Sequence, residues 1–514
     1  MPDDSSGSNL RHRTLVGLGW RSLTTGGRIL LRLSIGVVLA RLLGPEAFGL
    51  IGLATIVIGF GDLFVDIGLG PAIVQRKTIT ERHVRAAFTL SVSGGLLLSL
   101  ITFSVAPFAA QLMGDEELIP IIECLALTFL FSGGGVVARS LLKRKLNFRS
   151  VLVVDLGSYV IGYGGLGITM ALLGYGVWSL VIASLVQAGL GAVIAYWLSY
   201  HSVWLLFSWH ETRELVRFGS GLTLARLINY CAVKGDYFIV GRTLGAGPLG
   251  LYTRAYQLMK TPLTHLVKVL VDVLFPALSK IQDDPPRLRR IFLQSVATIV
   301  FCTAPLVGTI VILAPEIVVG LYGEKWTGAI VPLQILGATG ICRALYNAAS
   351  AFVRAHGDVF KIAACQAVYA VSTIGGAWLG AHYYGIEGAS MGVAGSIILM
   401  YMMMMGLAQY LTGTSTWKNM RMHGPGALLA LPVTGGAYTG KIIGSNLIGN
   451  AIVAMFLGLL FACLSGIVFI RLFPSRWMTP TIPILLNTAE DYLPYRAYMY
   501  IVKWVRPNMK YREA

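Results

Sequence analysis

Long apolar segments follow one another along most of this chain, and short polar segments separate them. About 20 apolar residues in a helix cross the hydrocarbon core of a bilayer, so each long segment predicts a spanning helix. The pattern therefore predicts an all-α polytopic membrane protein with about 14 transmembrane helices. Their expected centres lie near residues 30, 59, 98, 130, 161, 187, 229, 264, 303, 341, 371, 398, 434 and 459.

One stretch of this pattern occurs twice. Residues 38–76 read VLARLLGPEAFGLIGLATIVIGFGDLFVDIGLGPAIVQR, which predicts a turn at Gly44 and Pro45 and then a helix from about Phe48 to Gly70. About 200 residues later the chain reads VGRTLGAGPLGLYTRAYQL. In this alignment Arg41, Leu43, Gly44, Gly49 and Leu50 fall on Arg242, Leu244, Gly245, Gly250 and Leu251.

The duplication predicts the domain organisation. We expect one lobe of six helices over residues 15–200 and a second over residues 215–412, with two further helices over residues 424–471. Because six is an even number, both lobes start from the same face of the membrane and form a parallel rather than an inverted repeat. Residues 1–14 and a basic, aromatic tail over residues 472–514 complete the chain.

Composition agrees with this picture. The 514 residues are 55% hydrophobic and 13% charged, with a mean hydropathy of +0.70, which leaves too little polar surface for a soluble globule. The net charge of +17 would suggest nucleic acid as a partner of a soluble protein, but the charges are not spread evenly. About 27 Lys and Arg fall on one side of the predicted membrane and about 4 on the other, so we expect both termini to be cytoplasmic and no nucleic-acid partner.

No sequence pattern predicts catalysis or a metal site. The longest predicted loops have about 15 to 20 residues, which is too short for an extramembrane catalytic domain. The six cysteines lie within apolar segments and have no CxxC or Cys/His ligand spacing. We therefore expect no enzyme activity and no cofactor beyond a coupling cation.

Basic residues within predicted spans are the strongest functional signal. A charge in the bilayer costs at least ~2.5 kcal/mol, so each one requires a partner or a watery cavity. Six such residues are candidate substrate contacts: Arg28, Arg32, Arg226, Lys234, Lys260 and Arg343. Arginine and lysine suit phosphate and carboxylate, so the predicted substrate is an anion. Arg139 and Lys268 are expected to extend toward the cytoplasmic rim instead.

Acidic residues in the spans have two readings. Folding the predicted hairpins brings Asp62 to the depth of Arg28 and Asp236 opposite Arg254, as in ion pairs that hold helices together. Alternatively, Asp62, Asp66 or Asp236 binds a coupling cation, H+ or Na+. Both readings stay open.

The two quoted stretches closely resemble those of the polysaccharide transporter family, Wzx-type flippases of the multidrug/oligosaccharidyl-lipid/polysaccharide superfamily. The resemblance covers the first 12 predicted helices and implies a fold similar to that of MATE transporters. It also implies that the protein moves an undecaprenyl-pyrophosphate-linked oligosaccharide across the bacterial inner membrane by ion-coupled alternating access. Expected partners are this lipid-linked anionic oligosaccharide, membrane lipid, a polysaccharide polymerase and a chain-length regulator of exopolysaccharide or lipopolysaccharide synthesis.

Two rival functions are weaker. A multidrug or cation antiporter of the same superfamily would need exposed acids, because a cavity rich in Arg and Lys repels cations. A membrane polysaccharide polymerase or ligase would be expected to have a large periplasmic loop, and the predicted loops on that side do not exceed about 15 residues.

Overall fold

The computed structural model describes residues 27–65, 69–76, 78–208, 230, 233–279 and 284–472. All regular elements within these ranges are helical, as the predicted all-α class requires. The chain divides into two compact units. The α5 unit comprises Arg32–Thr253 and Thr373–Gly392, and the α11 unit comprises Met1–Leu31, Arg254–Ser372 and Val393–Ala514. The domain boundaries predicted from the sequence stay predictions.

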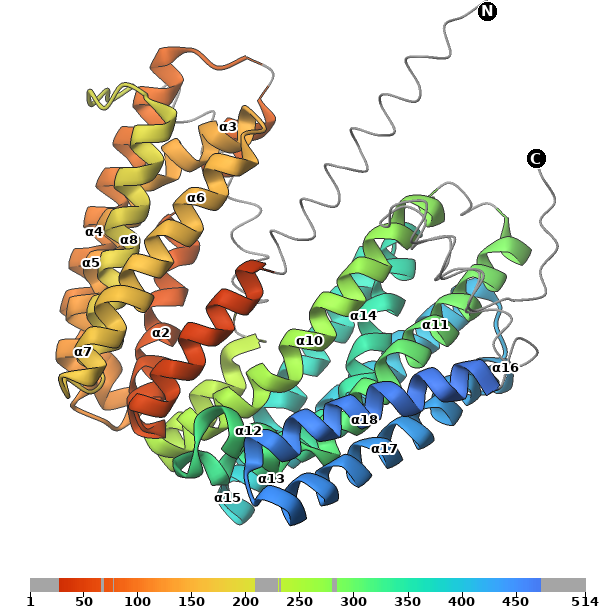
Figure 1. Ribbon diagram of the computed structural model, residues 1–514. Coiled ribbons are helices and arrows are strands. Elements are labelled where there is room, and N and C mark those ends of the chain that lie inside the picture. The colour runs from red at the N-terminus through yellow and green to blue at the C-terminus, as the bar shows by residue number, and fades with distance from the viewer. Residues whose placement is uncertain are drawn as a thin grey trace, which may run out of the picture. The chain divides into compact units, whose positions relative to one another are not determined.

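The α5 unit is a bundle of long helices (Figure 1). After a helix over residues 27–42 come α2 (Pro45–Val65), α3 (Leu69–Gln75), α4 (Glu81–Met113), α5 (Leu118–Arg144), α6 (Phe148–Tyr159), a π-helix (Val160–Gly167), α7 (Ile168–Leu172) and α8 (Trp178–Ser199). Helix α5 packs against α2, α3, α4 and α8, and so lies at the centre of this unit.

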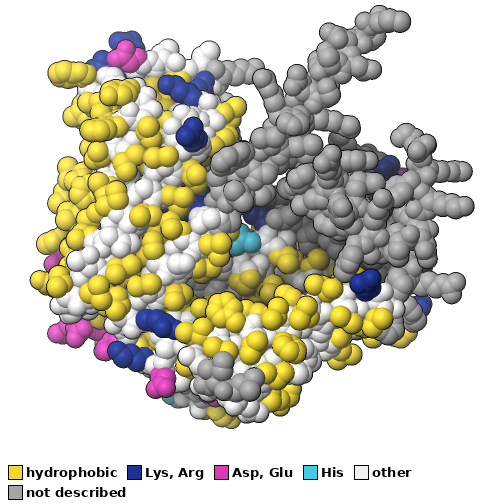
Figure 2. All heavy atoms as spheres, in the orientation of Figure 1, with side chains coloured by type: hydrophobic (Ala, Val, Ile, Leu, Met, Phe, Trp, Pro, Cys, Tyr) yellow, Lys and Arg dark blue, Asp and Glu magenta, His cyan; other side chains and the backbone are white. Residues whose placement is uncertain are grey.

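The helices of the α5 unit bury small residues and expose large apolar ones. On α4, Ser91, Gly95 and Ser99 are buried, whereas Leu97 and Leu100 are 59% exposed. Figure 2 shows hydrophobic side chains over the outer face of this bundle and charged side chains near its ends. Small residues let helices approach closely inside a bilayer, where lipid covers the large ones. This arrangement is typical of a membrane protein.

The α11 unit holds the remaining elements. They are most of α10 (Ala246–Ser279), α11 (Pro285–Ile312), α12 (Ala314–Tyr322), a 3-10 helix (Glu324–Ala329), α13 (Ile330–Ala338), α14 (Gly340–Ala355), parts of α15 (Val359–Thr412), α16 (Thr416–Arg421), α17 (Gly424–Ile448) and α18 (Ala451–Leu472). Its main core contains Phe292 and Phe352, whose rings meet edge to face at 5.1 Å, together with Met404.

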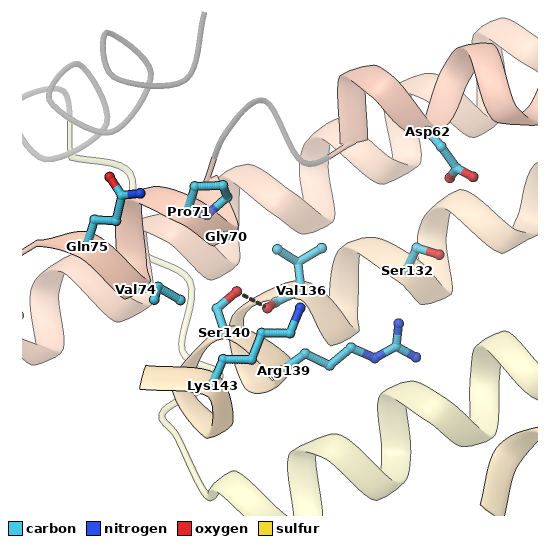
Figure 3. A pocket seen from close by; sticks show the side chains of 10 residues that line it. All are labelled: Asp62, Gly70, Pro71, Val74, Gln75, Ser132, Val136, Arg139, Ser140 and Lys143. Carbon is cyan, nitrogen blue, oxygen red and sulfur yellow. Dashed lines mark hydrogen bonds between the residues drawn. The ribbon is translucent and has the colours of Figure 1, made fainter. Parts of the chain in front are cut away.

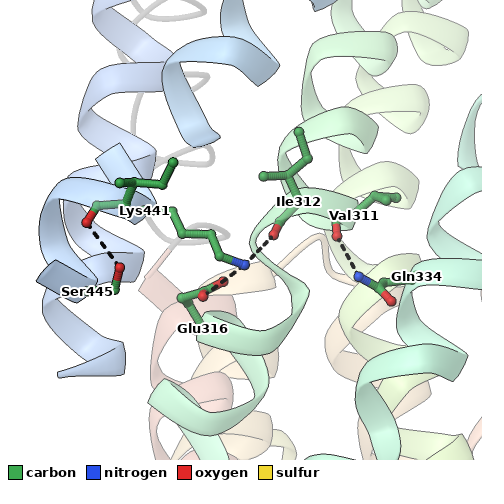
Figure 4. Close-up of polar contacts among 7 residues, drawn as sticks. Val311, Ile312, Glu316, Gln334, Lys441 and Ser445 are labelled. Carbon is green, nitrogen blue, oxygen red and sulfur yellow. Dashed lines mark hydrogen bonds and ion pairs between the residues drawn. The ribbon is translucent and has the colours of Figure 1, made fainter. Parts of the chain in front are cut away.

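The last two helices are fastened to the α11 unit by packing and by one ion pair. Helices α17 and α18 pack on each other, and also against α11 and α12 respectively. The Lys441 ammonium on α17 lies 3.0 Å from a carboxylate oxygen of Glu316 on α12 and donates to the Ile312 carbonyl at 3.5 Å (Figure 4). Lys441 lies within helix α17, where the carboxylate of Glu316 compensates its charge.

Eight helices within the described ranges are long and apolar enough to cross a membrane, or nine if the bent pair Glu324–Ala338 and Gly340–Ala355 is one span. One of the eight, α15, has non-helical backbone at Tyr384 and Gly385, between the predicted spans centred near 371 and 398. Gly385 has φ 57, a left-handed conformation that glycine adopts readily. The protein is thus a multi-pass membrane protein, and the number 14 stays a prediction.

The predicted ends of the helix from about Phe48 to Gly70 were wrong. Helix α2 begins three residues earlier, at Pro45, because proline is favoured in the first turn of a helix. It ends at Val65, and Leu69 already begins the separate helix α3.

The two copies of the repeated motif lie against each other within the α5 unit. A Cβ atom on Gly49 would overlap the carbonyl of Ala246, and one on Gly250 would overlap the carbonyl of Pro45. In the alignment of the two copies Gly49 corresponds to Gly250 and Pro45 to Ala246, so the two contacts are equivalent. The beginnings of α2 and α10 therefore touch through backbone atoms, with no room for a side chain.

This contact predicts the effect of adding one methyl group. Gly250→Ala should lower the free energy of unfolding by about 1–3 kcal/mol, because the new Cβ forces the two backbones apart. Gly247→Ala is the matched control, since nothing lies within 4 Å of the atom it adds in the same first turn of α10. Thermal unfolding of the purified variants measures both. Equal stability of the two variants would contradict the proposed contact.

The segment after α8 is bound along the start of α4. The Arg85 Nε donates to the Trp204 carbonyl at 3.2 Å, and the Leu206 amide donates to the Thr89 hydroxyl at 2.8 Å. This short segment therefore has a defined path over the α5 unit rather than extending from it.

His201 is the titratable group of this segment. Its Nδ1 lies 3.1 Å from the Ser202 carbonyl, and its ring lies 5.5 Å from Phe88 of α4 and 5.4 Å from Tyr196 of α8. Its Nε2 is buried and has no hydrogen-bond partner in the described part of the chain. Glu81 lines the cavity beside it. A proton on Nε2 would place a charge in this buried site.

Acidification should therefore loosen this segment. Burial lowers the pKa of His201 below its usual 6.5, although the bond to Ser202 opposes the shift. A lowered pKa favours the neutral ring in the folded state, so its contribution to stability is complete above pH ~6.5 and is lost as the pH falls below that value. Wild type should lose more thermal stability than His201→Gln between about pH 7.5 and 5.5. An equal loss in both proteins would refute this prediction.

Candidate functional site

The predicted cations of the α5 unit lie on aromatic rings. The Arg32 guanidinium carbon lies 5.1 Å from the ring centroid of Tyr159 on α6, and the Tyr159 hydroxyl donates to the Arg32 carbonyl at 3.5 Å. The Lys234 ammonium lies 4.3 Å from the ring centroid of Tyr237. The face of an aromatic ring attracts a cation electrostatically, but it is not a conventional hydrogen-bond acceptor for the N–H groups of that cation. These contacts orient both cations without neutralising them.

Asp236 is the buried acid of this unit. It is 2% exposed, and its carboxylate accepts hydrogen bonds from the Tyr252 hydroxyl at 2.9 Å and from the Tyr237 amide at 2.9 Å. The rings of Tyr237 and Tyr252 meet edge to face at 5.9 Å, and Lys234 interacts electrostatically with Asp236. We call these four residues, Lys234, Asp236, Tyr237 and Tyr252, the Asp236 cluster.

The α11 unit contains a second cluster around Tyr256. The Arg343 Nη1 donates to the Tyr256 hydroxyl at 2.6 Å, and the guanidinium carbon lies 5.1 Å from the centroid of that ring. The Lys260 ammonium lies 5.8 Å from the same centroid. Tyr346 and Tyr369, whose centroids are 6.2 Å apart, also interact with Arg343. We call these five residues the Tyr256 cluster.

The Tyr256 cluster has the chemistry of an anion and sugar site. Helices α10 and α14 bring two cations to one tyrosine ring, and tyrosine is neutral at physiological pH. A guanidinium can bind phosphate oxygens in pairs, while tyrosines offer both ring faces and hydroxyl groups. Within the described ranges no three His, Cys, Asp or Glu side chains are grouped closely enough to hold a metal ion.

The other predicted site residues are placed as follows. Arg28 is partly buried on the helix over residues 27–42, and the side chain of Asp62 is exposed on α2. Arg254 donates to the Gln257 side chain at 2.9 Å. Arg28 and Asp62 belong to different units, as do Arg254 and Asp236, so both expected ion pairs stay predictions. Arg226 and Asp66 lie outside the described residues.

Comparison with known proteins identifies the family. A family model described as "Polysaccharide biosynthesis protein" matches residues 38–332, which is more than half of the chain. The chain therefore belongs to the polysaccharide transporter family. The matched residues include both copies of the repeated motif and the Asp236 cluster, as well as Tyr256 and Lys260.

Individual relatives of this polysaccharide transporter are named for polysaccharide synthesis or transport. The chain is 27% identical to the lipopolysaccharide biosynthesis protein WzxC of Escherichia coli (strain K12), over 66% of this chain and 69% of that protein. It is also 27% identical to the succinoglycan biosynthesis transport protein ExoT of Rhizobium meliloti (strain 1021), over 65% of this chain and 67% of that one.

A solved structure supports the fold. The lipid II flippase MurJ, in an inward closed conformation, superposes with a TM-score of 0.70 at 14% identity, covering 88% of this chain and 98% of MurJ. At this identity the likeness concerns the fold alone. The family model confirms the predicted family, and the likeness to MurJ agrees with the fold that the resemblance implies.

Sequence reasoning found the cations of this polysaccharide transporter but missed their tyrosines. Tyr237 follows Lys234 by three residues, Tyr346 follows Arg343 by three, and Tyr256 precedes Lys260 by four. Side chains three or four apart share one face of a helix, so this spacing could have revealed the pairs. For Arg32 no such signal exists, because Tyr159 lies 127 residues away.

The Asp236 cluster generates one stability prediction. Tyr252→Phe should lower the free energy of unfolding by about 1–3 kcal/mol, because it removes a hydrogen bond from a buried carboxylate. Tyr410→Phe is the control, since that tyrosine is 79% exposed. Thermal unfolding of both purified variants checks the difference. If Tyr252→Phe were as stable as the control, the hydroxyl would not stabilise Asp236.

Proposed function

We propose that this polysaccharide transporter is a flippase for lipid-linked oligosaccharides. It moves an undecaprenyl-pyrophosphate-linked, anionic repeat unit from the cytoplasmic to the periplasmic leaflet of the bacterial inner membrane, with both termini in the cytoplasm. The names of the relatives support transport in polysaccharide synthesis. The lipid-linked substrate, the direction of transport and the orientation of the termini belong to the proposal.

The observation that carries the proposal is the Tyr256 cluster. Its two cations lie on α10 and α14 of a membrane protein, where a charge is costly. Within the described ranges the Arg343 side chain contacts tyrosines, which hold the guanidinium without neutralising it. A pyrophosphate would compensate the charge of Arg343, and the tyrosine rings would pack against sugar. Arg28, Arg32, Arg226 and Lys234 remain proposed contacts of the head group during its passage.

We also propose that an ion gradient drives transport by alternating access. A membrane potential supplies ~2.3 kcal/mol per charge per 100 mV, and Asp62, Asp66 or Asp236 would bind the coupling cation, H+ or Na+. The polymerase and the chain-length regulator would then act on the translocated unit. Translocation that continues after both the H+ and the Na+ gradients have been collapsed would remove ion coupling from the proposal.

The first test follows the lipid-linked intermediate in cells that lack this protein. We expect the intermediate to be made and to stay on the cytoplasmic face, with surface polysaccharide lost. An intermediate that reaches the periplasm but stays unpolymerised would favour a polymerase or ligase instead. An intermediate that moves normally, together with increased sensitivity to cationic drugs, would favour a multidrug antiporter.

Restoring these cells with variants tests the cluster. Arg343→Gln should lower polysaccharide export at least ~10-fold, which corresponds to a loss of about 1.4 kcal/mol of binding to the anionic group. Arg354→Gln is the control on the same helix, because Arg354 is exposed in the last turn of α14. Both variants must be present in the membrane at wild-type levels. Unchanged export with Arg343→Gln would make the Tyr256 cluster structural.

A further inference from the structure

The α5 unit contains a cavity of about 560 Å³, and of the residues that line it the proposed function uses Asp62 alone. It lies between α2, α3 and α5, and Figure 3 shows the side chains that line it. Asp62 lies toward one end and Gln75 toward the other, while Arg139 and Lys143 extend from α5 between them. Ser132 lines the same cavity on α5. Its size is within the range of small-molecule sites.

The wall formed by α3 is held in place. The Arg144 Nη1 donates to the carbonyls of Ile73 at 2.8 Å and Arg76 at 2.5 Å, and so fastens the end of α3 to α5. Behind this wall, Leu69 and Ile73 are buried in an apolar cluster with Val137 of α5. The cavity is therefore preformed and does not need a ligand to order its walls.

The charges of the cavity are not paired with one another. Arg139 has a buried Nε without a hydrogen-bond partner in the described part of the chain, and its guanidinium lies against Gly191 of α8. Among the described residues, the Lys143 ammonium and the Asp62 carboxylate also have no hydrogen bond or ion pair. A buried N–H without an acceptor costs free energy, so a ligand that supplies oxygen atoms would be favoured there.

The positions of these groups indicate the class of ligand. Arg139 and Lys143 are four residues apart on one face of α5, so both cations can approach a single phosphate. Ser132 lies seven residues before Arg139, about 10 Å along the helix axis. At that depth, Ser132 can donate or accept a hydrogen bond, while the Asp62 carboxylate accepts from hydroxyl groups. A ligand that has a phosphate at one end and hydroxyl groups at the other is a phosphorylated sugar.

We propose that this cavity is a binding site for a glycosyl phosphate, with the phosphate on Arg139 and Lys143 and the sugar hydroxyls on Asp62 and Ser132. The chemistry occurs both in soluble sugar phosphates and in sugars linked to a polyprenyl lipid. The lipid-linked sugar as the source of the ligand rests on the proposed flippase function, whereas the site itself does not. Lys143 lies at the end of α5 that the charge pattern places at the cytoplasmic face.

Direct binding to the full-length protein in phosphatidylcholine nanodiscs tests the site without transport. Glucose 1-phosphate should bind saturably and more tightly than inorganic phosphate. Arg139→Gln and Lys143→Gln should each weaken this binding at least ~10-fold. Lys145→Gln is the matched control, because Lys145 is an exposed cation two residues further on that does not line the cavity, and it should leave binding unchanged.

Asp62→Asn separates the two ends of the site. It should reduce the preference for glucose 1-phosphate over inorganic phosphate, because it weakens the acceptor for sugar hydroxyls, while phosphate itself binds at least as well. If Arg139→Gln fails to fold, Arg139→Lys and Asp62→Asn still test the site, and Arg139→Lys should retain part of the affinity.

A second arm identifies the source of the ligand. If the lipid-linked sugar binds, nanodiscs that also contain undecaprenyl phosphoglucose should protect the wild type against thermal unfolding more than they protect the Arg139 variants. Binding of either probe that depends on Arg139 supports the proposal and names the source. Failure of both probes, or equal binding in Arg139→Gln and Lys145→Gln, would overturn it. Neither result depends on export, so the flippase proposal stands or falls separately.

Discussion

The backbone contact between the starts of α2 and α10 positions the hydrogen-bond donor to the buried acid of the α5 unit. Gly49 meets the carbonyl of Ala246 and Gly250 meets that of Pro45, so these segments are held at the distance of bare backbones. Tyr252 follows Gly250 by two residues and donates its hydroxyl to Asp236. A buried carboxylate requires such a donor. The close approach of two glycines therefore positions the partner of the buried acid.

Tyrosine is the common partner of the basic residues. Arg32, Lys234, Lys260 and Arg343 all lie near a tyrosine ring, at distances between 4.3 and 5.8 Å from the centroid. A carboxylate partner would cancel the charge, whereas an aromatic ring only lowers the cost of burying it. Tyrosine contacts therefore lower the cost of placing these cations in helices of a membrane protein, and this agrees with the proposal that the protein binds an anion.

The N-terminal half of the matched family region contains a second kind of basic site. Arg139 and Lys143 line a preformed cavity beside α3, and their environment is polar rather than aromatic. By contrast, Lys441 at the other end of the chain is paired with Glu316 and fastens α17 to α12. The same residue types thus occur in two settings, one ion-paired between helices and the other beside a cavity whose charges form no ion pair with one another in the described part of the chain.

The sequence by itself determined the class of fold, because about 20 consecutive apolar residues have few alternatives to a spanning helix. It also located the turn before Pro45 and the break between the two halves of α15, and it singled out basic residues such as Arg343 that lie within helices. These features are local, since they depend on residues within one or two helical turns. For the same reason, the spacing of Lys234 and Tyr237 already contained the information for their contact.

The tertiary structure decided which distant residues meet. Arg139 looked like a rim residue in the sequence, but the packing of α3 and α8 on α5 places it in a cavity with a buried Nε. Arg32 meets Tyr159 across 127 residues. Such contacts depend on how each helix is rotated about its axis and which neighbour it packs against. Hydrophobic periodicity alone does not fix these choices when lipid and protein are equally apolar.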